Sequence, residues 1–167
     1  MTDTVSRLER AADRSEIYDV LAKLCRGLDR LDPSLVAAAY HEDAMAHHGP
    51  FDKPGRELGP ELVEMVRTHT ENAFHILSNV AIEFDGDTAW VESYCTAITR
   101  DADKYDDIGS RWADRFERRN GEWKIAERTS IVEYNRSFPR GEEGALVGLF
   151  HNGSRDRSDP SYVRARR

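Results

Sequence analysis

The stretch around which this chain is organised is Leu24-Cys25-Arg26-Gly27-Leu28-Asp29-Arg30-Leu31-Asp32, near the end of the first expected helix. Asp29 follows Cys25 by four residues and Leu21 by eight, so these residues share one helix face. The apolar members of that face are Ile17, Leu21, Leu24 and Leu28. Gly27 lets another element or a ligand approach the helix closely. A carboxylate turned toward a core needs a partner. We therefore expect the rest of the chain to build a pocket over Asp29, with His75 as the partner.

The composition is that of an ordinary acidic globular protein. The chain has 167 residues, of which 39% are hydrophobic and 33% charged, and its formal net charge is −7. This length suits one domain with a sizeable core. The negative charge argues against general nucleic-acid binding. Basic residues concentrate in 153–167, which we interpret as a short solvated tail.

The two cysteines, Cys25 and Cys95, come without any other sign of an oxidising compartment. The N-terminus carries no apolar leader, and no run of residues approaches the length of a membrane span. We therefore expect a cytoplasmic protein with two reduced thiols and no membrane partner.

The first half of the chain predicts helices. Residues 1–12 are polar and are expected to fray, whereas Asp13 and Glu16 fit a capping box that opens a helix running to about Arg30. Asp32-Pro33 is typical of a second helix start. The further elements expected in this half are a helix over 33–40, a strand over 44–48, a loop over 51–59 and a helix over 60–70.

From Ala73 onward the pattern changes to strands joined by tight turns. Asp85-Gly86 and Asn120-Gly121 are hairpin-turn sequences. Long strands are expected over 74–84, 88–99, 109–118 and 122–134, with a charged loop over 100–108. This order indicates an α+β fold, in which about three N-terminal helices and a curved sheet enclose an apolar pocket. The chain then divides into a polar segment 1–12, a domain 13–135, and an extension and tail 136–167.

His75 is the first residue that can carry chemistry. A lone histidine on a strand is most simply explained as a side chain satisfied by a backbone carbonyl. The position of Asp29 favours the functional interpretation, because a buried Asp and a buried His satisfy each other. A carboxylate bonded to one imidazole nitrogen fixes the tautomer and frees the other nitrogen as a general base.

The sequence indicates a functional role for other polar residues less clearly. Arg111 stands between apolar neighbours, and it points either into the pocket, where it would bind a developing negative charge, or outward to an acidic partner. His47 and His48 are adjacent, so one of them can line the pocket. No spacing matches a metal site, a nucleotide-binding glycine loop or a Gly-x-Ser-x-Gly elbow. Cys25 is interpreted as a small core residue.

Several stretches, spread over nearly the whole chain, match one known family. They are Ile17–Val20, Gly27–Asp32, His41–Ala44, His75–Val80, Gly86–Ala89, Gly109–Glu117, Gly121–Arg128 and Asp159–Tyr162. In this order they resemble the SnoaL-like branch of the nuclear-transport-factor-2-like superfamily. The match is specific for the fold and says little about the substrate, since this fold hosts many functions.

The resemblance implies a cone-shaped α+β barrel with an apolar pocket. The informative relatives are cofactor-free lyases, namely scytalone dehydratases, bile-acid 7α-dehydratases and hexachlorocyclohexane dehydrochlorinases, which are commonly trimers. In these lyases an Asp orients a His that removes a proton, and Asp29 and His75 fall on those two positions. Arg111 falls where the dehydrochlorinase has an arginine near its leaving group.

The chain departs from these relatives at two positions. Such lyases often carry Lys or Tyr where this chain has Leu24, and scytalone dehydratase has a tyrosine where it has Leu28. The group that assists departure of the leaving group is therefore missing or comes from elsewhere. The residues that can supply it are Tyr40, His48, Tyr94 and Tyr105.

We therefore expect a cofactor-independent lyase that acts on a hydrophobic aromatic or alicyclic small molecule, with loss of water, halide or a small carbonyl fragment. His75, Asp29 and Arg111 are the expected catalytic residues. The residues expected to contact substrate are Leu24, Leu28, Tyr40, His48, Tyr94 and Trp112. A homo-oligomer is expected, a trimer or else a dimer.

Two alternatives to the lyase stay open. An isomerase or cyclase would use the same base. A protein that only binds a small molecule, or one like the small subunit of ring-hydroxylating dioxygenases, would not need Asp29 and His75 in contact at an open pocket.

Overall fold

The structure is a computed structural model that describes residues 2–162 of the chain. Its helices are α1 (Thr2–Asp29), α2 (Pro33–Ala38) and α3 (Gly55–His69). Its strands are β1 (Tyr40–His48), β2 (Phe51–Pro54), β3 (Asn72–Asp85), β4 (Thr88–Arg100), β5 (Lys104–Arg119) and β6 (Glu122–Pro139). Two 3₁₀ turns follow, η1 (Ala145–Gly148) and η2 (Pro160–Tyr162). The expected α+β order is confirmed.

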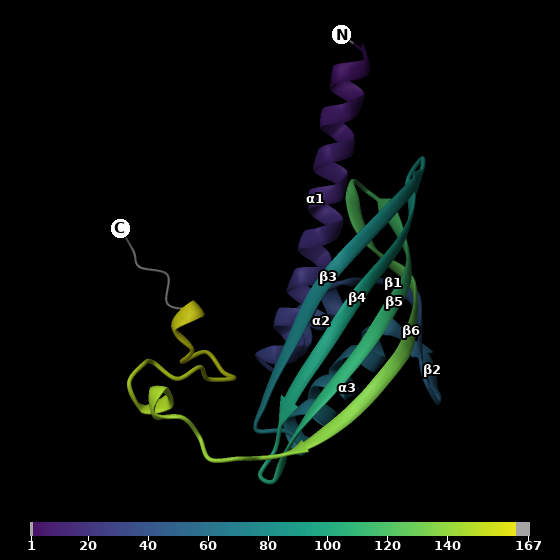
Figure 1. The fold of residues 1–167 in the computed structure, drawn as a ribbon. Coiled ribbons are helices and arrows are strands. Elements are labelled where there is room, and N and C mark those ends of the chain that lie inside the picture. The colour runs from purple at the N-terminus through teal and green to yellow at the C-terminus, as the bar shows by residue number, and fades with distance from the viewer. Residues whose placement is uncertain (1, 163–167) are drawn as a thin grey trace.

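The strands form one mixed, open sheet in the order β2-β1-β6-β5-β4-β3. β1 pairs with β6 in parallel, and the other neighbours pair antiparallel. The long strands β3 to β6 curve over α1, α2 and α3, which cover the same face of the sheet (Figure 1). A curved sheet with helices on one face leaves room between the two layers, and the pocket described below lies there.

The core joins the apolar stripe of α1 to the inner face of the sheet. Ile17 and Leu21 have no exposed surface, and Phe116 of β5 and Ile125 of β6, which belong to the same cluster, have none either. Burial of each such side chain contributes about 1.5–3 kcal/mol. The apolar residues that recur at helical spacing in the sequence therefore hold α1 against the sheet.

Gly27 allows α2 to pack closely against α1, as expected. A Cβ atom at position 27 would lie 2.7 Å from Val36 Cγ2 and 3.0 Å from the Val36 nitrogen. Val36 itself is buried, with 1% of its surface exposed. A side chain at position 27 would therefore push the two helices apart.

The first helix begins earlier than the sequence predicted. α1 starts at Thr2, so the expected fraying over 1–12 and the N-cap role of Asp13 are both wrong for the residues that the structure describes. Asp13 is instead buried inside the helix, where it accepts hydrogen bonds from Trp123 Nε1 at 2.9 Å and Arg118 Nη1 at 3.0 Å. Within residues 2–162 no helix combines the length and apolar character needed to cross a bilayer.

The short elements of the first half also differ from the expectation. α2 ends at Ala38, and the residue at position 40 already belongs to β1, where it pairs with Ile125. The expected loop over 51–59 contains β2 and the start of α3. Pro54 is compatible with a strand there because β2 is the outer strand of the sheet. The Pro- and Gly-rich sequence therefore concealed regular structure.

The long strands extend beyond their expected ends. Most of the charged stretch 100–108 belongs to the sheet, because β4 ends at Arg100 and β5 begins at Lys104. β6 continues to Pro139, which pairs with Lys104. These ends carry polar side chains on both faces, so they lack the apolar alternation that marks a strand in a sequence.

The C-terminal segment, defined here as residues 140–162, packs against the ends of α1 and α3. Asp159 is buried and accepts hydrogen bonds from the Ser154 and Ser161 backbone nitrogens, each at 2.9 Å. Arg30 Nε lies 3.7 Å from Asp159 Oδ2, and Arg155 Nη1 donates to the Thr70 carbonyl oxygen at 2.8 Å. The expectation of a solvated tail over 153–167 is therefore wrong for Arg155 and Asp159, and the basic residues Arg164, Arg166 and Arg167 lie outside the described residues.

Candidate active site

Asp29 and His75 are in direct contact. Asp29 is the last residue of α1, and its Oδ1 lies 2.7 Å from His75 Nδ1. The His75 backbone nitrogen also donates to the same carboxylate, at 3.0 Å to Oδ1 and 3.3 Å to Oδ2. One carboxylate therefore fixes both the backbone and the ring of His75, at the point where the end of α1 meets β3.

This contact fixes the tautomer of the neutral imidazole. A carboxylate can only accept a hydrogen bond, so in the neutral ring Nδ1 carries the hydrogen and Nε2 keeps its lone pair. The side chains of His75 and Asp29 are 11% and 17% exposed, so little water competes for the bond. In this arrangement Nε2 can act as a general base while the carboxylate orients the ring.

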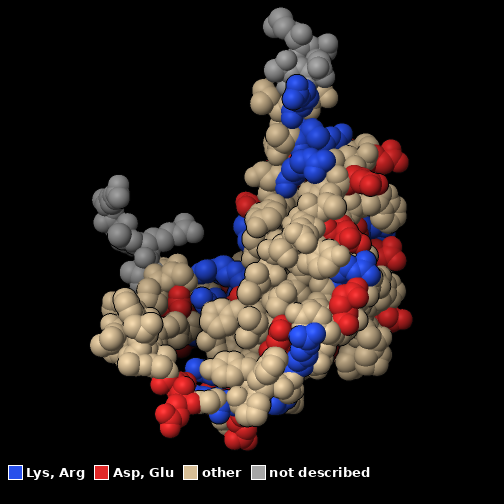
Figure 2. All heavy atoms as spheres, viewed as in Figure 1, with Lys and Arg blue, Asp and Glu red and all other residues tan. Residues whose placement is uncertain are grey.

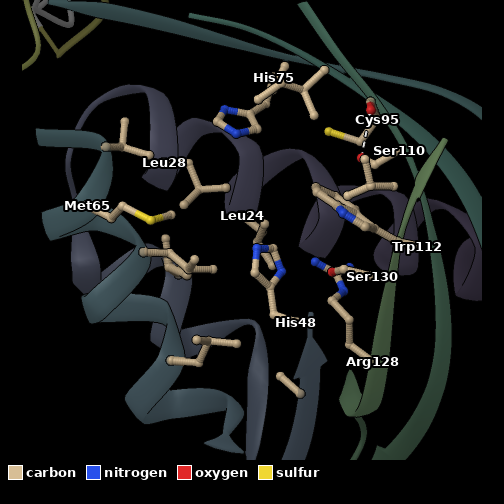
Figure 3. Close-up of a pocket in the computed structure, with 18 of the residues that line it drawn as sticks. Leu24, Leu28, His48, Met65, His75, Cys95, Ser110, Trp112, Arg128 and Ser130 are labelled. Atoms are coloured by element: carbon tan, nitrogen blue, oxygen red, sulfur yellow. Dashed lines mark hydrogen bonds between the residues drawn. The ribbon is translucent and has the colours of Figure 1, made fainter. Parts of the chain in front are cut away.

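His75 lines a cavity of about 480 Å³ between the helices and the sheet. This volume suits a small organic molecule. The helix side of the cavity is apolar and is formed by Leu24, Leu28, Leu58, Leu62, Met65 and Val66. The rings of His75 and His48 point toward one another across the cavity, with Trp112 and Arg128 beside them (Figure 3). The expected apolar pocket is therefore present.

Arg128 brings a positive charge to the pocket wall. Its Nε and Nη2 donate to Asp114 Oδ1 and Oδ2 at 2.7 and 2.6 Å, and its guanidinium lies 4.0 Å from the centre of the Trp112 ring. Burial alone would lower the pKa of Arg128, but the Asp114 carboxylate outweighs it and raises that pKa. Nη1 takes no part in the bonds to Asp114, so its N–H groups can serve a ligand in the pocket.

Two further polar side chains in the pocket are uncharged. Burial, with a smaller effect of Arg128, lowers the pKa of His48, so its imidazole is neutral at pH 7. Burial raises the pKa of Tyr40, whose phenol therefore keeps its proton. Both groups can hydrogen-bond a leaving group without carrying a charge themselves.

The structure corrects the expected position of Arg111. Arg111 lies on the outer face of the sheet, where Nε donates to Glu133 Oε1 at 2.6 Å and Nη1 to Glu92 Oε2 at 2.9 Å. Its neighbours Ser110 and Trp112 line the pocket, and alternation along a strand turns Arg111 away. Its interpretation as an outward side chain paired with acidic residues was the correct one.

Tyr94 is also turned away from the pocket. It pairs with Arg111 in the sheet register, is 41% exposed and is not among the residues that line the cavity. Tyr105 does not line it either. The other residues expected to contact a substrate do line the pocket, namely Leu24, Leu28, Tyr40, His48 and Trp112.

The sequence interpretation missed Arg128, Ser110 and Ser130. A signal for Arg128 was present, because Asp114 stands between Trp112 and Phe116 at the spacing of an inward-facing strand residue. A buried Asp needs a cationic partner, and Arg128 is the residue opposite Asp114 in the register of β5 and β6.

The two cysteines are free and buried. Cys95 lies in the pocket wall. A hydrogen bond with Cys25 and burial both raise the pKa of the Cys95 thiol, which therefore stays protonated. Neither residue has the environment of a nucleophile, and the interpretation of Cys25 as a small core residue is confirmed. Among the described residues, no three His, Cys, Asp or Glu side chains gather as a metal site.

An open sheet curved over three helices, with an apolar pocket and an Asp–His pair in its wall, defines the class of small cone-shaped α+β proteins. The chain belongs to the SnoaL-like domain family, whose model matches residues 9–129. The expected family is therefore confirmed. No curated protein matches the sequence.

Solved structures with the same fold include LinA, at 23% identity and a TM-score of 0.75, with 84% of this chain and 98% of that chain covered. A hexachlorocyclohexane dehydrochlorinase, LinA-type3 from Novosphingobium barchaimii LL02, is 22% identical with a TM-score of 0.72, covering 79% and 94%. A candidate scytalone dehydratase from Novosphingobium aromaticivorans is 23% identical with a TM-score of 0.71, covering 86% and 100%. At these identities the likeness establishes the fold.

Proposed function

We propose that the protein is a cofactor-independent lyase that removes a proton and a leaving group from a hydrophobic aromatic or alicyclic small molecule. The observation that carries the proposal is the 2.7 Å contact between Asp29 Oδ1 and His75 Nδ1 at the wall of the pocket. The fold is shared with a dehydrochlorinase and with a candidate scytalone dehydratase, both of which are named for elimination reactions.

In the proposed reaction, His75 Nε2 takes a proton from a substrate carbon. The electron pair of that C–H bond becomes the π bond of an alkene, and the leaving group departs from the neighbouring carbon with its own bonding pair. Asp29 stabilises the imidazolium that forms. A hydroxide leaves as water after taking the proton from His75, whereas a halide leaves as an anion and the proton passes to solvent.

The pair also borders a second hollow on its other side. Asp29 and His75 also line a smaller hollow of about 290 Å³ between α1 and β3, together with Arg26 and Arg30. Solvent in this hollow can exchange the Nδ1 hydrogen, whereas the proton taken up by Nε2 passes to solvent through the main pocket after the product leaves.

Arg128 takes the role that the sequence interpretation gave to Arg111. Its Nη1 can stabilise an oxyanion or halide in the pocket, in surroundings where water does not screen the charge. His48 and Tyr40 are proposed to assist the leaving group in place of the Lys or Tyr that Leu24 replaces. Each is an uncharged hydrogen-bonding group of the pocket wall.

We further propose a homo-oligomer, a trimer or else a dimer, working in the cytoplasm without a cofactor. Large apolar side chains on the sheet support association, since Phe74 and Ile76 of β3 and Trp90 of β4 are each at least half exposed. Light scattering on the purified chain measures the oligomer size directly, and a monomer at micromolar concentration would contradict this part of the proposal.

The experiment is a screen of eliminable alicyclic and aromatic substrates, with scytalone and γ-hexachlorocyclohexane among them, followed by mass spectrometry of the products. Substitution His75→Ala is expected to lower turnover by about 10²–10⁴-fold, and Asp29→Asn to lower it as well. The matched control is His47→Ala, on the outer side of β1, where His47 Nδ1 pairs with Asp52 at 2.9 Å. Turnover that survives loss of His75 with the fold intact would exclude it as the base.

An isomerase or cyclase with the same base is the second candidate, because both reactions begin with the same proton abstraction. The product mass separates them, since an isomerase returns the mass of the substrate and a lyase loses water, halide or a carbonyl fragment. In deuterium oxide, an isomerised product would also carry solvent deuterium if the proton on His75 Nε2 exchanges with solvent before it returns to the substrate.

A further inference from the structure

The guanidinium of Arg155, in the C-terminal segment beside the pocket, has hydrogen-bond partners for only one of its three nitrogens among the described residues. Its Nη1 donates to the Thr70 carbonyl oxygen at 2.8 Å and to Thr70 Oγ1 at 3.1 Å. Its Nε and Nη2 are buried and have no hydrogen-bond partner among the described residues. Buried charged groups are normally paired, so these two nitrogens call for a partner of opposite charge.

The neighbouring arginines differ from Arg155 in that each lies beside a carboxylate or an aromatic ring. Arg157 lies 3.5 Å from the carboxylate of Asp32. Arg30 lies 3.7 Å from the carboxylate of Asp159, although its Nε makes no hydrogen bond either. Arg26 lies over the Tyr162 ring at 4.6 Å and donates to Ser161. Within residues 2–162, no carboxylate lies within 4.0 Å of the Arg155 nitrogens.

The free nitrogens form the side of the guanidinium that binds carboxylates. Nε and Nη2 point in the same direction, and Arg128 uses this same pair to bind both oxygens of Asp114. In Arg155 the corresponding fork is buried and has no hydrogen-bond partner among the described residues, whereas Nη1 is occupied by Thr70. The geometry is therefore suited to a two-oxygen anion.

The charges around Arg155 favour the binding of an anion. Burial lowers the pKa of Arg155, Asp29 opposes this shift, and Arg67 and Arg30 add to it. Basic side chains gather where the C-terminal segment meets the body of the molecule (Figure 2). An anion bound there would compensate the charge of Arg155, since Arg30 and Arg67 already face carboxylates.

The location connects this group to the pocket. Thr70, which accepts two hydrogen bonds from Arg155, is one of the residues that line the cavity beside His75. We propose that Arg155 binds the carboxylate of a substrate whose apolar part fills the pocket, so that the substrate class is a hydrophobic carboxylic acid. The fork nitrogens are covered by protein, so a carboxylate reaches them through a local shift of the side chains around Arg155, while Nη1 stays bound to Thr70.

This inference rests on the proposed function, because the ligand is a substrate only if the protein is an enzyme. Its test measures binding and requires no turnover. Benzoate and its neutral analogue benzamide are the probes, and calorimetry on the full chain measures their affinities. Benzoate is expected to bind about 10-fold or more tightly than benzamide, since a charge-assisted hydrogen bond typically contributes that much. Arg155→Met is expected to remove this preference, whereas the control Arg157→Met on the same segment keeps it.

A second variant covers the case in which Arg155→Met does not fold. Arg155→Lys keeps the charge and lacks the fork, so it is expected to lose most of the preference. Equal affinity for both probes in the native chain, a preference that survives both substitutions, or no measurable binding of benzoate would each overturn the proposal. His75→Ala separates the two proposals, because it is expected to abolish turnover and to leave the benzoate preference intact.

Discussion

The ion pair of Asp114 and Arg128 gives a prediction that needs no substrate. The Asp114 side chain has no exposed surface, the Arg128 side chain is 5% exposed, and the two bonds between them measure 2.7 and 2.6 Å. Asp114→Asn keeps the shape of the side chain and removes its charge, which leaves the guanidinium buried without a counter-charge. Breaking a buried pair in this way costs about 3–5 kcal/mol of the free energy of unfolding.

Urea unfolding followed by circular dichroism measures this cost. The midpoint is expected to fall at an unchanged slope, since the surface exposed on unfolding stays the same. The double substitution Asp114→Asn/Arg128→Met is expected to recover part of the loss, because it removes the uncompensated charge. Arg111→Ala, which breaks exposed bonds on the outer face of the same sheet, is the control and should hardly shift the midpoint. A loss under about 1 kcal/mol for Asp114→Asn would show that the pair is not buried as described.

Three further predictions follow from the pocket and its surroundings. Burial lowers the pKa of His48 below 6.5, so the unfolded chain binds more protons than the folded one and the stability falls as the pH drops below that value. Urea titrations between pH 7 and 5 should show a weaker pH dependence of stability for His48→Phe, and the same pH dependence in both chains would contradict this role of His48. Gly27→Ala is expected to destabilise the fold by about 1–3 kcal/mol, although alanine favours helices, because its Cβ would overlap Val36. In thermal unfolding, adding Val36→Ala to the same chain should recover part of this loss, and a Gly27→Ala chain more stable than the native one would refute the overlap. Arg111→Ala is expected to leave turnover unchanged, whereas Arg128→Met lowers kcat, and steady-state kinetics showing the reverse would return the catalytic role to Arg111.

The pairing of Asp29 with His75 could be predicted because each residue was out of place in its own element. A carboxylate on the apolar stripe of a helix is a strong local anomaly, and the cost of burying it requires a partner. The Gly27 contact was predictable for a similar reason, since only a close neighbour explains a glycine inside a helix.

The orientation of Arg111 was not predictable from its own strand. Side chains alternate across a sheet, but β5 carries polar residues on both faces, so the pattern did not say which face is the inner one. The register of β5 with β6 settles the question, because it places Asp114 opposite Arg128 in the interior. Register depends on pairing between distant segments, which a single sequence does not reveal.

The C-terminal segment was hidden for another reason. It has little regular structure, and its position depends on single contacts such as that of Arg155 with Thr70, across 85 residues of chain. No periodicity marks such contacts.

The central claim is that Asp29 holds His75 with its Nδ1 protonated and its Nε2 bare toward the pocket. Nitrogen NMR of the imidazole, at a pH where the ring is neutral, measures this tautomer directly. A protonated Nδ1 and an unprotonated Nε2, with the preference lost in Asp29→Asn, is the result that we predict. A hydrogen on Nε2 in the native protein would contradict it, because the base would then have no lone pair to offer a substrate.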